Sequence, residues 1–206
     1  MERMRIVRLK TVIIALALLA LVACSSSAGV KKVPDDQTIK PQAGDSAWTT
    51  TSIDGVEIAV PGDLEKTGPI SPGDDAVMFT FQTRKNSFGT RGGVQVVTLP
   101  KLKKSAIELA DTVISQAEAT IGATETTKVQ VIWPGAKDAW LVTYVAHVPM
   151  NGKTAPHPAE VLILDLPGGG QSQATVTALD EDFKSLKMHE ILETVKITKT
   201  AGSRMS

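Results

Sequence analysis

The chain has 206 residues, in which 22 Lys and Arg balance 22 Asp and Glu, and it contains one cysteine. Without residues 1–23 it keeps 18 basic and 21 acidic side chains, a net charge of −3. This charge argues against nucleic acid and anionic lipid as dedicated partners, because both are bound through clustered positive charge. A single cysteine also excludes an intramolecular disulfide. The remaining length and the 42% hydrophobic content are typical of one globular domain.

The first 23 residues have the three-part layout of a secretory signal peptide. Four basic residues, from Arg3 to Lys10, precede an apolar run that begins at Val12 and ends at Cys24. A helix needs about 20 apolar residues to span a bilayer, and this run is shorter. We therefore predict that the chain is exported and that residues 1–23 are removed.

The segment Leu21-Val22-Ala23-Cys24 indicates a lipid anchor. It resembles the bacterial lipobox, in which the cysteine thiol receives a diacylglycerol and cleavage makes that cysteine the new N-terminus. Stable anchoring needs more than one acyl chain, such as palmitate, and a lipoprotein carries several. We expect Cys24 to hold the protein at the extracytoplasmic face of the cell membrane. The alternatives are a plain signal peptide with an incidental cysteine and an uncleaved anchor.

The mature chain is expected to begin with a tether. Residues 24–47 are polar and lack apolar periodicity, so we predict a flexible tether from the lipidated cysteine to the domain. One domain should follow over residues 48–198, with a disordered tail over 199–206. The domain opens with β-prone residues around Asp54-Gly55, a typical hairpin turn. The hairpin residues expected in the core are Ile53, Val56, Ile58 and Val60.

Two strands and a helix are predicted next. A loop over residues 69–75 leads to a strand at 76–81 with apolar residues on both faces, and a second strand covers 94–99. Ser105 begins a Ser-x-x-Glu capping box, and Gly122 is placed to end the helix that follows. The apolar stripe of this helix is expected to consist of Ile107, Ala110, Val113 or Ile114, Ala117 and Ile121.

Four further strands follow at short intervals, over residues 128–133, 139–148, 159–166 and 172–178. The second and third of these carry apolar residues on both faces, so both faces need cover. An antiparallel meander with helices on both sides satisfies that requirement. A last helical region is expected from Asp180, where three successive acidic residues suit a helix start.

Histidines supply the alternative functional sites. His147 and His157 flank the hairpin at Asn151-Gly152 and are expected to approach one another across it. Two histidines fall short of the three protein ligands of a catalytic zinc site, so a metal-handling role stays an alternative. A hydrolase with an unrecognised Ser/His/Asp arrangement around either histidine is the other alternative. We predict no catalytic residue, no metal site and no cofactor, and the sequence suggests no partner for His189.

The order of the predicted elements resembles the PsbP-like α/β/α sandwich, an α+β fold with a central antiparallel sheet and helices on both faces. Two motifs carry the likeness, Val56-Glu-Ile-Ala-Val-Pro61 and the closing Ile191-Leu-x-Thr-Val-x-Ile197. With the lipobox and the polar tether, the chain is similar to actinobacterial lipoproteins of the LpqN/LpqT type. The resemblance implies a non-catalytic binding or scaffolding role, with an envelope protein or an apolar small molecule as partner.

Overall fold

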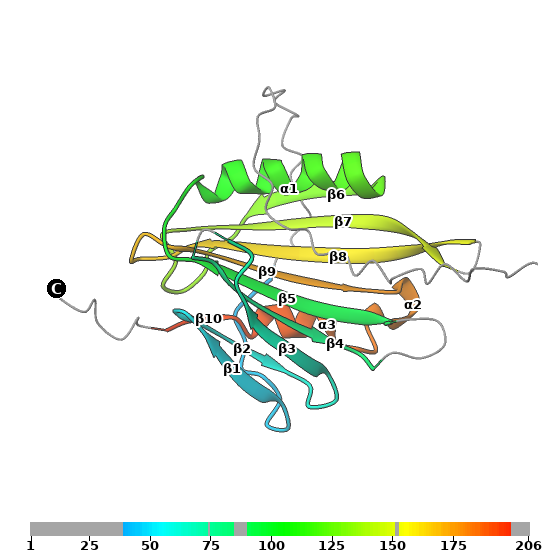
Figure 1. Cartoon of the computed structure of the whole chain (residues 1–206), viewed down its shortest axis with the longest axis horizontal. Helices are drawn as coiled ribbons and strands as arrows, with labels where there is room; N and C mark the ends of the chain where they lie inside the picture. Colours follow the sequence, from blue (N-terminus) through cyan, green and yellow to red (C-terminus); the bar gives the residue numbers. More distant parts are fainter. Residues whose placement is uncertain (1–38, 74, 85–89, 151–152, 199–206) are drawn as a thin grey trace, which may run out of the picture.

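The computed structural model describes residues 39–73, 75–84, 90–150 and 153–198 (Figure 1). A seven-stranded sheet dominates the domain, with the strand order β3-β4-β5-β9-β8-β7-β6. All neighbouring strands are antiparallel, so the predicted α+β class with a central antiparallel sheet is confirmed. The strands are β3 (Glu65–Ile70), β4 (Val77–Gln82), β5 (Gly92–Leu99), β6 (Thr124–Gln130), β7 (Asp138–Met150), β8 (Lys153–Asp165) and β9 (Gln171–Ala178).

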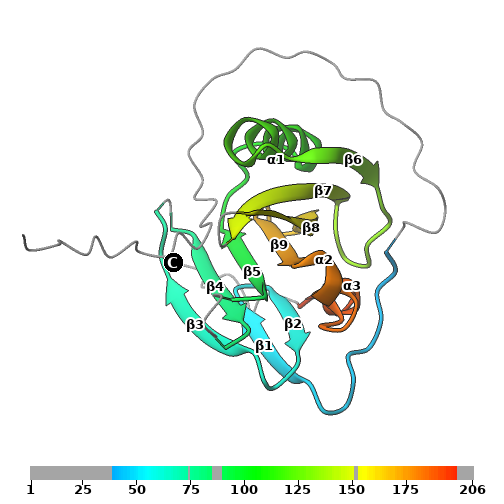
Figure 2. The same ribbon diagram turned by 90° about the vertical axis from the view of Figure 1, so that its right-hand side faces the viewer.

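Helix α1 (Ala106–Ile121) covers one face of this sheet, over β6, β7 and β8 (Figure 2). It begins with the predicted capping box, in which the Ser105 N–H donates to Glu108 Oε2 at 2.8 Å. Gly122 ends it in the left-handed conformation, with φ of 59°. The residues buried between helix and sheet are Ala106, Leu109, Ala110, Val113 and Ala117 with Trp140, Val142, Tyr144, Val161 and Ile163.

The opposite face is covered by two short helices and a three-stranded sheet with the order β1-β2-β10. Helices therefore lie on both faces of the large sheet, as predicted. Strands β1 and β2 form the expected hairpin around Asp54-Gly55, and its four predicted core residues are each at most 2% exposed. The elements are β1 (Thr49–Ile53), β2 (Val56–Val60), α2 (Asp180–Phe183), α3 (Met188–Glu193) and β10 (Lys196–Ile197).

The C-terminal segment fastens this second layer to the large sheet. Its predicted single helical region is divided into α2 and α3, because Lys187 adopts a left-handed conformation with φ of 54°. The chain then runs on to β10, which pairs with β2. The Trp133 indole Nε1–H donates to the Val195 carbonyl at 3.1 Å and ties the segment to the loop between β6 and β7.

Some element bounds differ from the predicted ones. Strand β3 was not predicted, because all six of its residues are exposed and show no apolar alternation. The hairpin of β7 and β8 is longer than expected, since β8 begins at Lys153 instead of residue 159. In α1, Ile107 is 37% exposed and Leu109 takes its place in the core, because the buried face centres on Ala106 and Ala110.

Ile39, the first described residue, is already packed, although it lies within the stretch 24–47 that we expected to be a flexible tether. Ile39 is 3% exposed and belongs to the core on the α3 side of the sheet. The Gln42 backbone N–H donates to the Glu193 carbonyl at 2.9 Å, and Gln42 Nε2 donates to Glu193 Oε2 at 2.7 Å. A single apolar residue in a polar stretch has no periodicity, so the pattern alone does not reveal this contact. Residues 24–38 and 199–206 lie outside the described residues.

Candidate functional site

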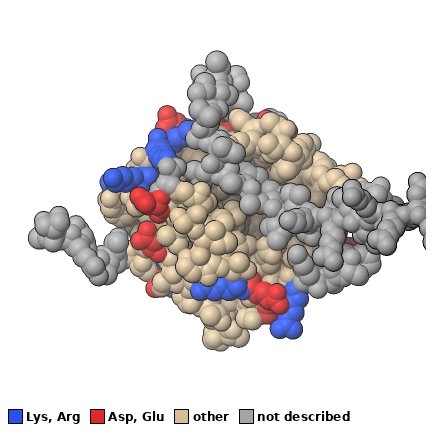
Figure 3. Space-filling model, viewed as in Figure 1, with Lys and Arg blue, Asp and Glu red and all other residues tan. Residues whose placement is uncertain are grey.

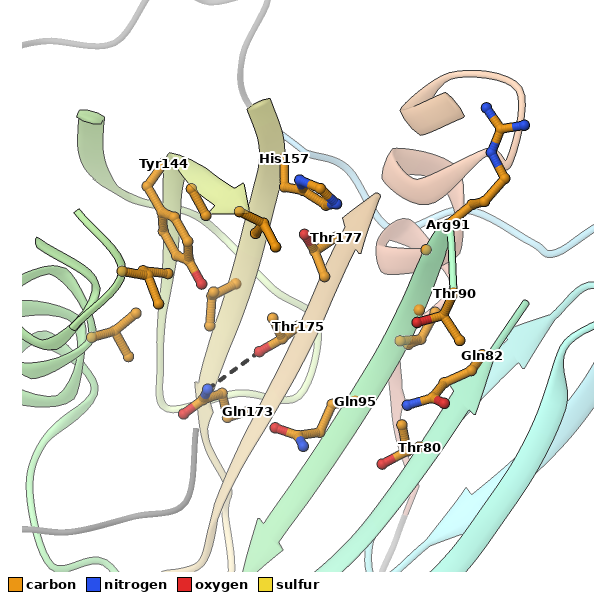
Figure 4. A pocket seen from close by; sticks show the side chains of 18 residues that line it. Thr80, Gln82, Thr90, Arg91, Gln95, Tyr144, His157, Gln173, Thr175 and Thr177 are labelled. Carbon is orange, nitrogen blue, oxygen red and sulfur yellow. Dashed lines mark hydrogen bonds between the residues drawn. The ribbon is translucent and has the colours of Figure 1, made fainter. Parts of the chain in front are cut away.

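A groove opens on the α1 face of the large sheet, between the helix and the strands that it leaves uncovered (Figure 4). We call it the α1 groove. Helix α1 packs on β6, β7 and β8, so β9, β5 and β4 present this face to the groove. Its volume is about 190 Å³. Its apolar side consists of Val113, Ile121, Tyr144, Ala146, Val148 and Val161, and its polar side of Thr80, Gln82, Gln95, Gln173, Thr175 and Thr177.

Strand register separates the two sides of the α1 groove. Residues directly opposite one another in an antiparallel pair share a face of the sheet. Val161 of β8 is opposite Thr175 of β9. Thr175 is in turn opposite Gln95 of β5, and Gln95 is opposite Thr80 of β4. This row changes from apolar to polar where α1 stops covering the sheet.

The polar side of the groove was not predicted, although the residue pattern of one strand, β9, indicates it. Strand β9 alternates strictly between polar and apolar residues from Gln173 to Ala178. The apolar members Ala174, Val176 and Ala178 belong to the core on the α3 side, while Gln173, Thr175 and Thr177 line the α1 groove. A strand with one polar face indicates a partly uncovered sheet. That alternation, set against the two-sided apolar pattern of β8, is the signal that identifies an open face.

The described lining of the α1 groove contains one permanent charge, and this charge is already paired. Arg91 Nε donates to Asp182 Oδ2 at 2.5 Å, and its terminal Nη2 donates to Glu181 Oε1 at 2.5 Å. Figure 4 shows the guanidinium directed away from the labelled Gln and Thr side chains. Burial raises the pKa of the Tyr144 phenol, so this group stays neutral at physiological pH. A ligand in the groove therefore meets largely uncharged surface.

The predicted approach of His147 and His157 is wrong. His147 is opposite Pro156, and His157 is opposite Ala146, so the two histidines occupy adjacent register positions and point to opposite faces of the sheet. His147 Nε2 lies 3.0 Å from Thr124 Oγ1. His157 lines the α1 groove, and its Nδ1–H donates to the Ala155 carbonyl at 3.1 Å. The pair cannot share one metal ion.

His189, for which the sequence suggested no partner, lies between two carboxylates. Its Nδ1 is 2.9 Å from Glu160 Oε2, and its Nε2 is 3.7 Å from Glu193 Oε1. The hydrogen bond with Glu160 is the main cause that raises the pKa of His189 above 6.5, and the charges of Glu160, Glu193 and Glu190 add to it while burial opposes it. The two carboxylates lie on opposite edges of the ring, so they favour the protonated imidazole and do not converge on one point as metal ligands do.

The lipobox residues Leu21, Val22, Ala23 and Cys24 lie outside the described residues, so the lipid anchor stays a prediction. Across the described ranges, no helix has the length and apolar character needed to cross a membrane. Over the same ranges, no group of three or more His, Cys, Asp and Glu is placed to hold a metal ion. On the face drawn in Figure 3, Lys and Arg side chains lie beside Asp and Glu and form no single basic patch among the coloured residues.

Comparison with known proteins does not assign a family. No family model and no curated protein matches the sequence. A Bacteroides thetaiotaomicron structure is 13% identical with a TM-score of 0.44, over 72% of this chain and 47% of the other, so the chain spans about half of that protein. A putative regulator of unknown function from Pseudomonas aeruginosa is 12% identical with a TM-score of 0.44, over 75% and 100%. LpqN of Mycobacterium tuberculosis, involved in cell envelope biogenesis, is 14% identical with a TM-score of 0.40, over 79% and 91%. At these values the likeness assigns no function, and the LpqN/LpqT-type identification stays a prediction.

Proposed function

We propose that this protein is a lipid-anchored lipoprotein of the cell envelope whose domain binds a small molecule with an apolar part in the α1 groove and catalyses no reaction. The lipobox at Leu21–Cys24 supports the anchored, extracytoplasmic location. The binding role rests on the α1 groove, a concave surface with an apolar side next to a helix and a polar side on the open sheet. Small-molecule sites typically combine an apolar cavity with a few placed polar groups.

The side chains of the α1 groove favour binding over catalysis. A hydroxyl nucleophile needs a base within hydrogen-bond reach, and that base needs a third group to orient it. His157 donates its Nδ1–H to a backbone carbonyl, and the Thr177 hydroxyl donates to the Pro158 carbonyl at 3.0 Å. None of the described lining residues is Asp, Glu, Lys or Cys. The hydrolase hypothesis therefore gains no support from the one histidine in the groove.

Native mass spectrometry tests the binding role. The full-length protein is purified from its own host's envelope in mild detergent, and its mass is compared with that of two variants. Thr175→Trp fills the α1 groove, whereas Thr50→Trp places the same side chain on the exposed edge of β1. We expect a reproducible extra mass on the wild type and on Thr50→Trp, and its loss from Thr175→Trp. A bare wild-type mass, or an adduct that Thr175→Trp retains, contradicts the proposal.

Metabolic labelling tests the anchor separately. Cells expressing the chain are grown with an alkyne-bearing palmitate analogue, and the wild type is compared with Cys24→Ser. The wild type should carry the label and sediment with membranes. Cys24 supplies the only thiol in the chain, so no other cysteine can replace it as the lipidation site. Cys24→Ser should lose the label and leave the membrane fraction. Equal labelling of the two proteins would refute the lipidation site without bearing on the α1 groove.

A further inference from the structure

We propose that the α1 groove selects an uncharged amphipathic molecule, with its apolar chain against the helix side and a neutral hydrogen-bonding head group on Gln95 and its neighbours. The inference rests on the proposed function and specifies the ligand of the same site. It follows from three observations, namely the order of residues across the sheet, the unused amides of the polar side and the pairing of the nearby charge.

The first observation is that polarity is graded across the α1 groove. From the helix outward, the row on the sheet passes from Val161 through Thr175 to Gln95. Neighbouring strands lie about 4.8 Å apart, so the apolar and polar sides are separated by about 5–10 Å. An alkyl chain placed against Val113 and Val161 therefore brings a head group, attached to its end, over β9 and β5. A wholly apolar ligand would either leave the polar side of the groove without a contact or displace its water without replacing the hydrogen bonds, and it would bind less tightly for that reason.

The second observation is the state of the glutamine amides. The side chains of Gln82 and Gln95 make no hydrogen bond with the described part of the protein, and both are half-buried in the α1 groove. Gln173 Nε2 makes one long contact of 3.3 Å, to Thr175 Oγ1. Each amide offers an acceptor oxygen and two donor hydrogens. Displacing their water with groups that cannot hydrogen-bond loses affinity, so the amides favour a ligand with donors and acceptors of its own.

The third observation concerns charge. The Arg91 guanidinium is occupied by Asp182 and Glu181, which leaves no free Lys or Arg among the described lining residues for a carboxylate or phosphate. No lining carboxylate is present there for an ammonium group either. Desolvating a charged head group without a counter-charge is costly, whereas hydroxyl, ester and amide groups are satisfied by glutamine and threonine. The groove thus discriminates by head-group charge.

The test compares twelve-carbon probes that differ only in the head group. Monolauroylglycerol is neutral, laurate is anionic and dodecyltrimethylammonium is cationic, and each is titrated below its critical micelle concentration by isothermal titration calorimetry. We expect monolauroylglycerol to bind at least about tenfold more tightly than the two ions, the factor expected for a mismatch between a charge and a neutral site. Gln95→Leu should weaken monolauroylglycerol binding by about tenfold, while Gln130→Leu, on the exposed end of β6, should leave it unchanged.

A charge-introducing variant gives an independent readout of the same inference. Gln95→Lys should raise the affinity for laurate and lower that for dodecyltrimethylammonium, because it adds an unpaired cation to the polar side. Equal binding of the three probes to the wild type, or no effect of Gln95→Leu, would overturn the selectivity and leave groove binding intact. If Thr175→Trp abolishes an envelope-derived adduct in native mass spectrometry but no probe binds, the ligand class is refuted while the proposed function stands.

Discussion

Replacement of Asp165 by alanine should destabilise the seating of α1 on the sheet. Asp165, the last residue of β8, is 7% exposed. It accepts hydrogen bonds from the Ala106 N–H at 3.1 Å and from Gln171 Nε2 at 2.7 Å. Ala106 is the first residue of α1, so its N–H has no acceptor within the helix. The negative charge of Asp165 also faces the positive end of the helix.

The expected loss follows from the two N–H groups that the substitution leaves without an acceptor, because Gln171 Nε2 then keeps only its other hydrogen bond, to the Lys104 carbonyl at 3.0 Å. Ala106 and Gln171 are 0% and 2% exposed, so water does not replace the carboxylate readily. Each buried, unsatisfied N–H group costs about 1–3 kcal/mol, so two of them predict a loss of about 2–6 kcal/mol in the free energy of unfolding. A domain of this size has about 5–15 kcal/mol, so the variant should still fold at low temperature. Asp165→Asn keeps one acceptor oxygen and should lose less.

Urea unfolding followed by circular dichroism measures this loss, with the mature chain from Cys24 as the protein. Asp63→Ala is the matched control, because Asp63 is exposed between β2 and β3. Its side chain makes no hydrogen bond or ion pair with another described residue. Its free energy of unfolding should change by less than about 0.5 kcal/mol. A loss of less than about 1 kcal/mol for Asp165→Ala, with an unchanged slope against urea, would refute the argument that these hydrogen bonds hold α1 in place.

Three further predictions concern other contacts. Gly92→Ala should cost about 1–3 kcal/mol, because an added Cβ would lie 2.9 Å from Ala178 Cβ, Leu186 Cδ1 and Met188 Cε, whereas Gly62→Ala meets no atom within 4 Å. His189, whose folded-state pKa is raised, should add stability that is fully present below pH 6.5 and is lost as the pH rises through the folded pKa. Its imidazole is 36% exposed, so the effect should stay below about 1 kcal/mol. Arg91→Gln should cost about 1 kcal/mol or less, and the cost should fall with added salt, because its ion pairs are partly exposed.

Each of these predictions has its own control measurement. The glycine pair is compared by thermal unfolding, and equal midpoints for the two alanine variants would contradict the predicted clash. For His189, urea midpoints are measured from pH 5 to pH 9 on the wild type and on His189→Gln, and parallel pH profiles would show that the histidine does not contribute. For Arg91→Gln, a loss that is the same at low and high salt would indicate a packing effect instead of an ionic one.

The sequence predicts those parts of the fold in which turn or cap residues stand next to a regular pattern of buried apolar residues. Asp54-Gly55 gives the first hairpin, and the Ser105 capping box with Gly122 gives both ends of α1. The exposed edge strand β3 was missed, because its residues bury nothing and therefore leave no apolar pattern. Ile39 was missed for the opposite reason, since a single buried residue forms no periodicity. Contacts between distant segments, such as Gln42 with Glu193, are not encoded in a local pattern.

The α1 groove was harder to predict than the fold. Its polar side comes from β4, β5 and β9, which are adjacent in the sheet but spread from residue 77 to residue 178. Only the register that brings Thr80, Gln95 and Thr175 into one row makes them a surface. The same register separates His147 from His157, although they flank one hairpin. Spacing along the chain suggests which residues come close, but the alternation of the strand decides which face each one occupies.

The contact between Gln42 and Glu193 fastens the N-terminal end of the described chain to the α3 side of the large sheet. If the protein is held at Cys24 as we propose, tension from the anchor would reach the described domain at Ile39 and Gln42, and from there α3 and the core beneath it. This route lies on the side of the sheet opposite α1. If the protein is anchored and binds its ligand as we propose, attachment and ligand access would use opposite faces of the large sheet.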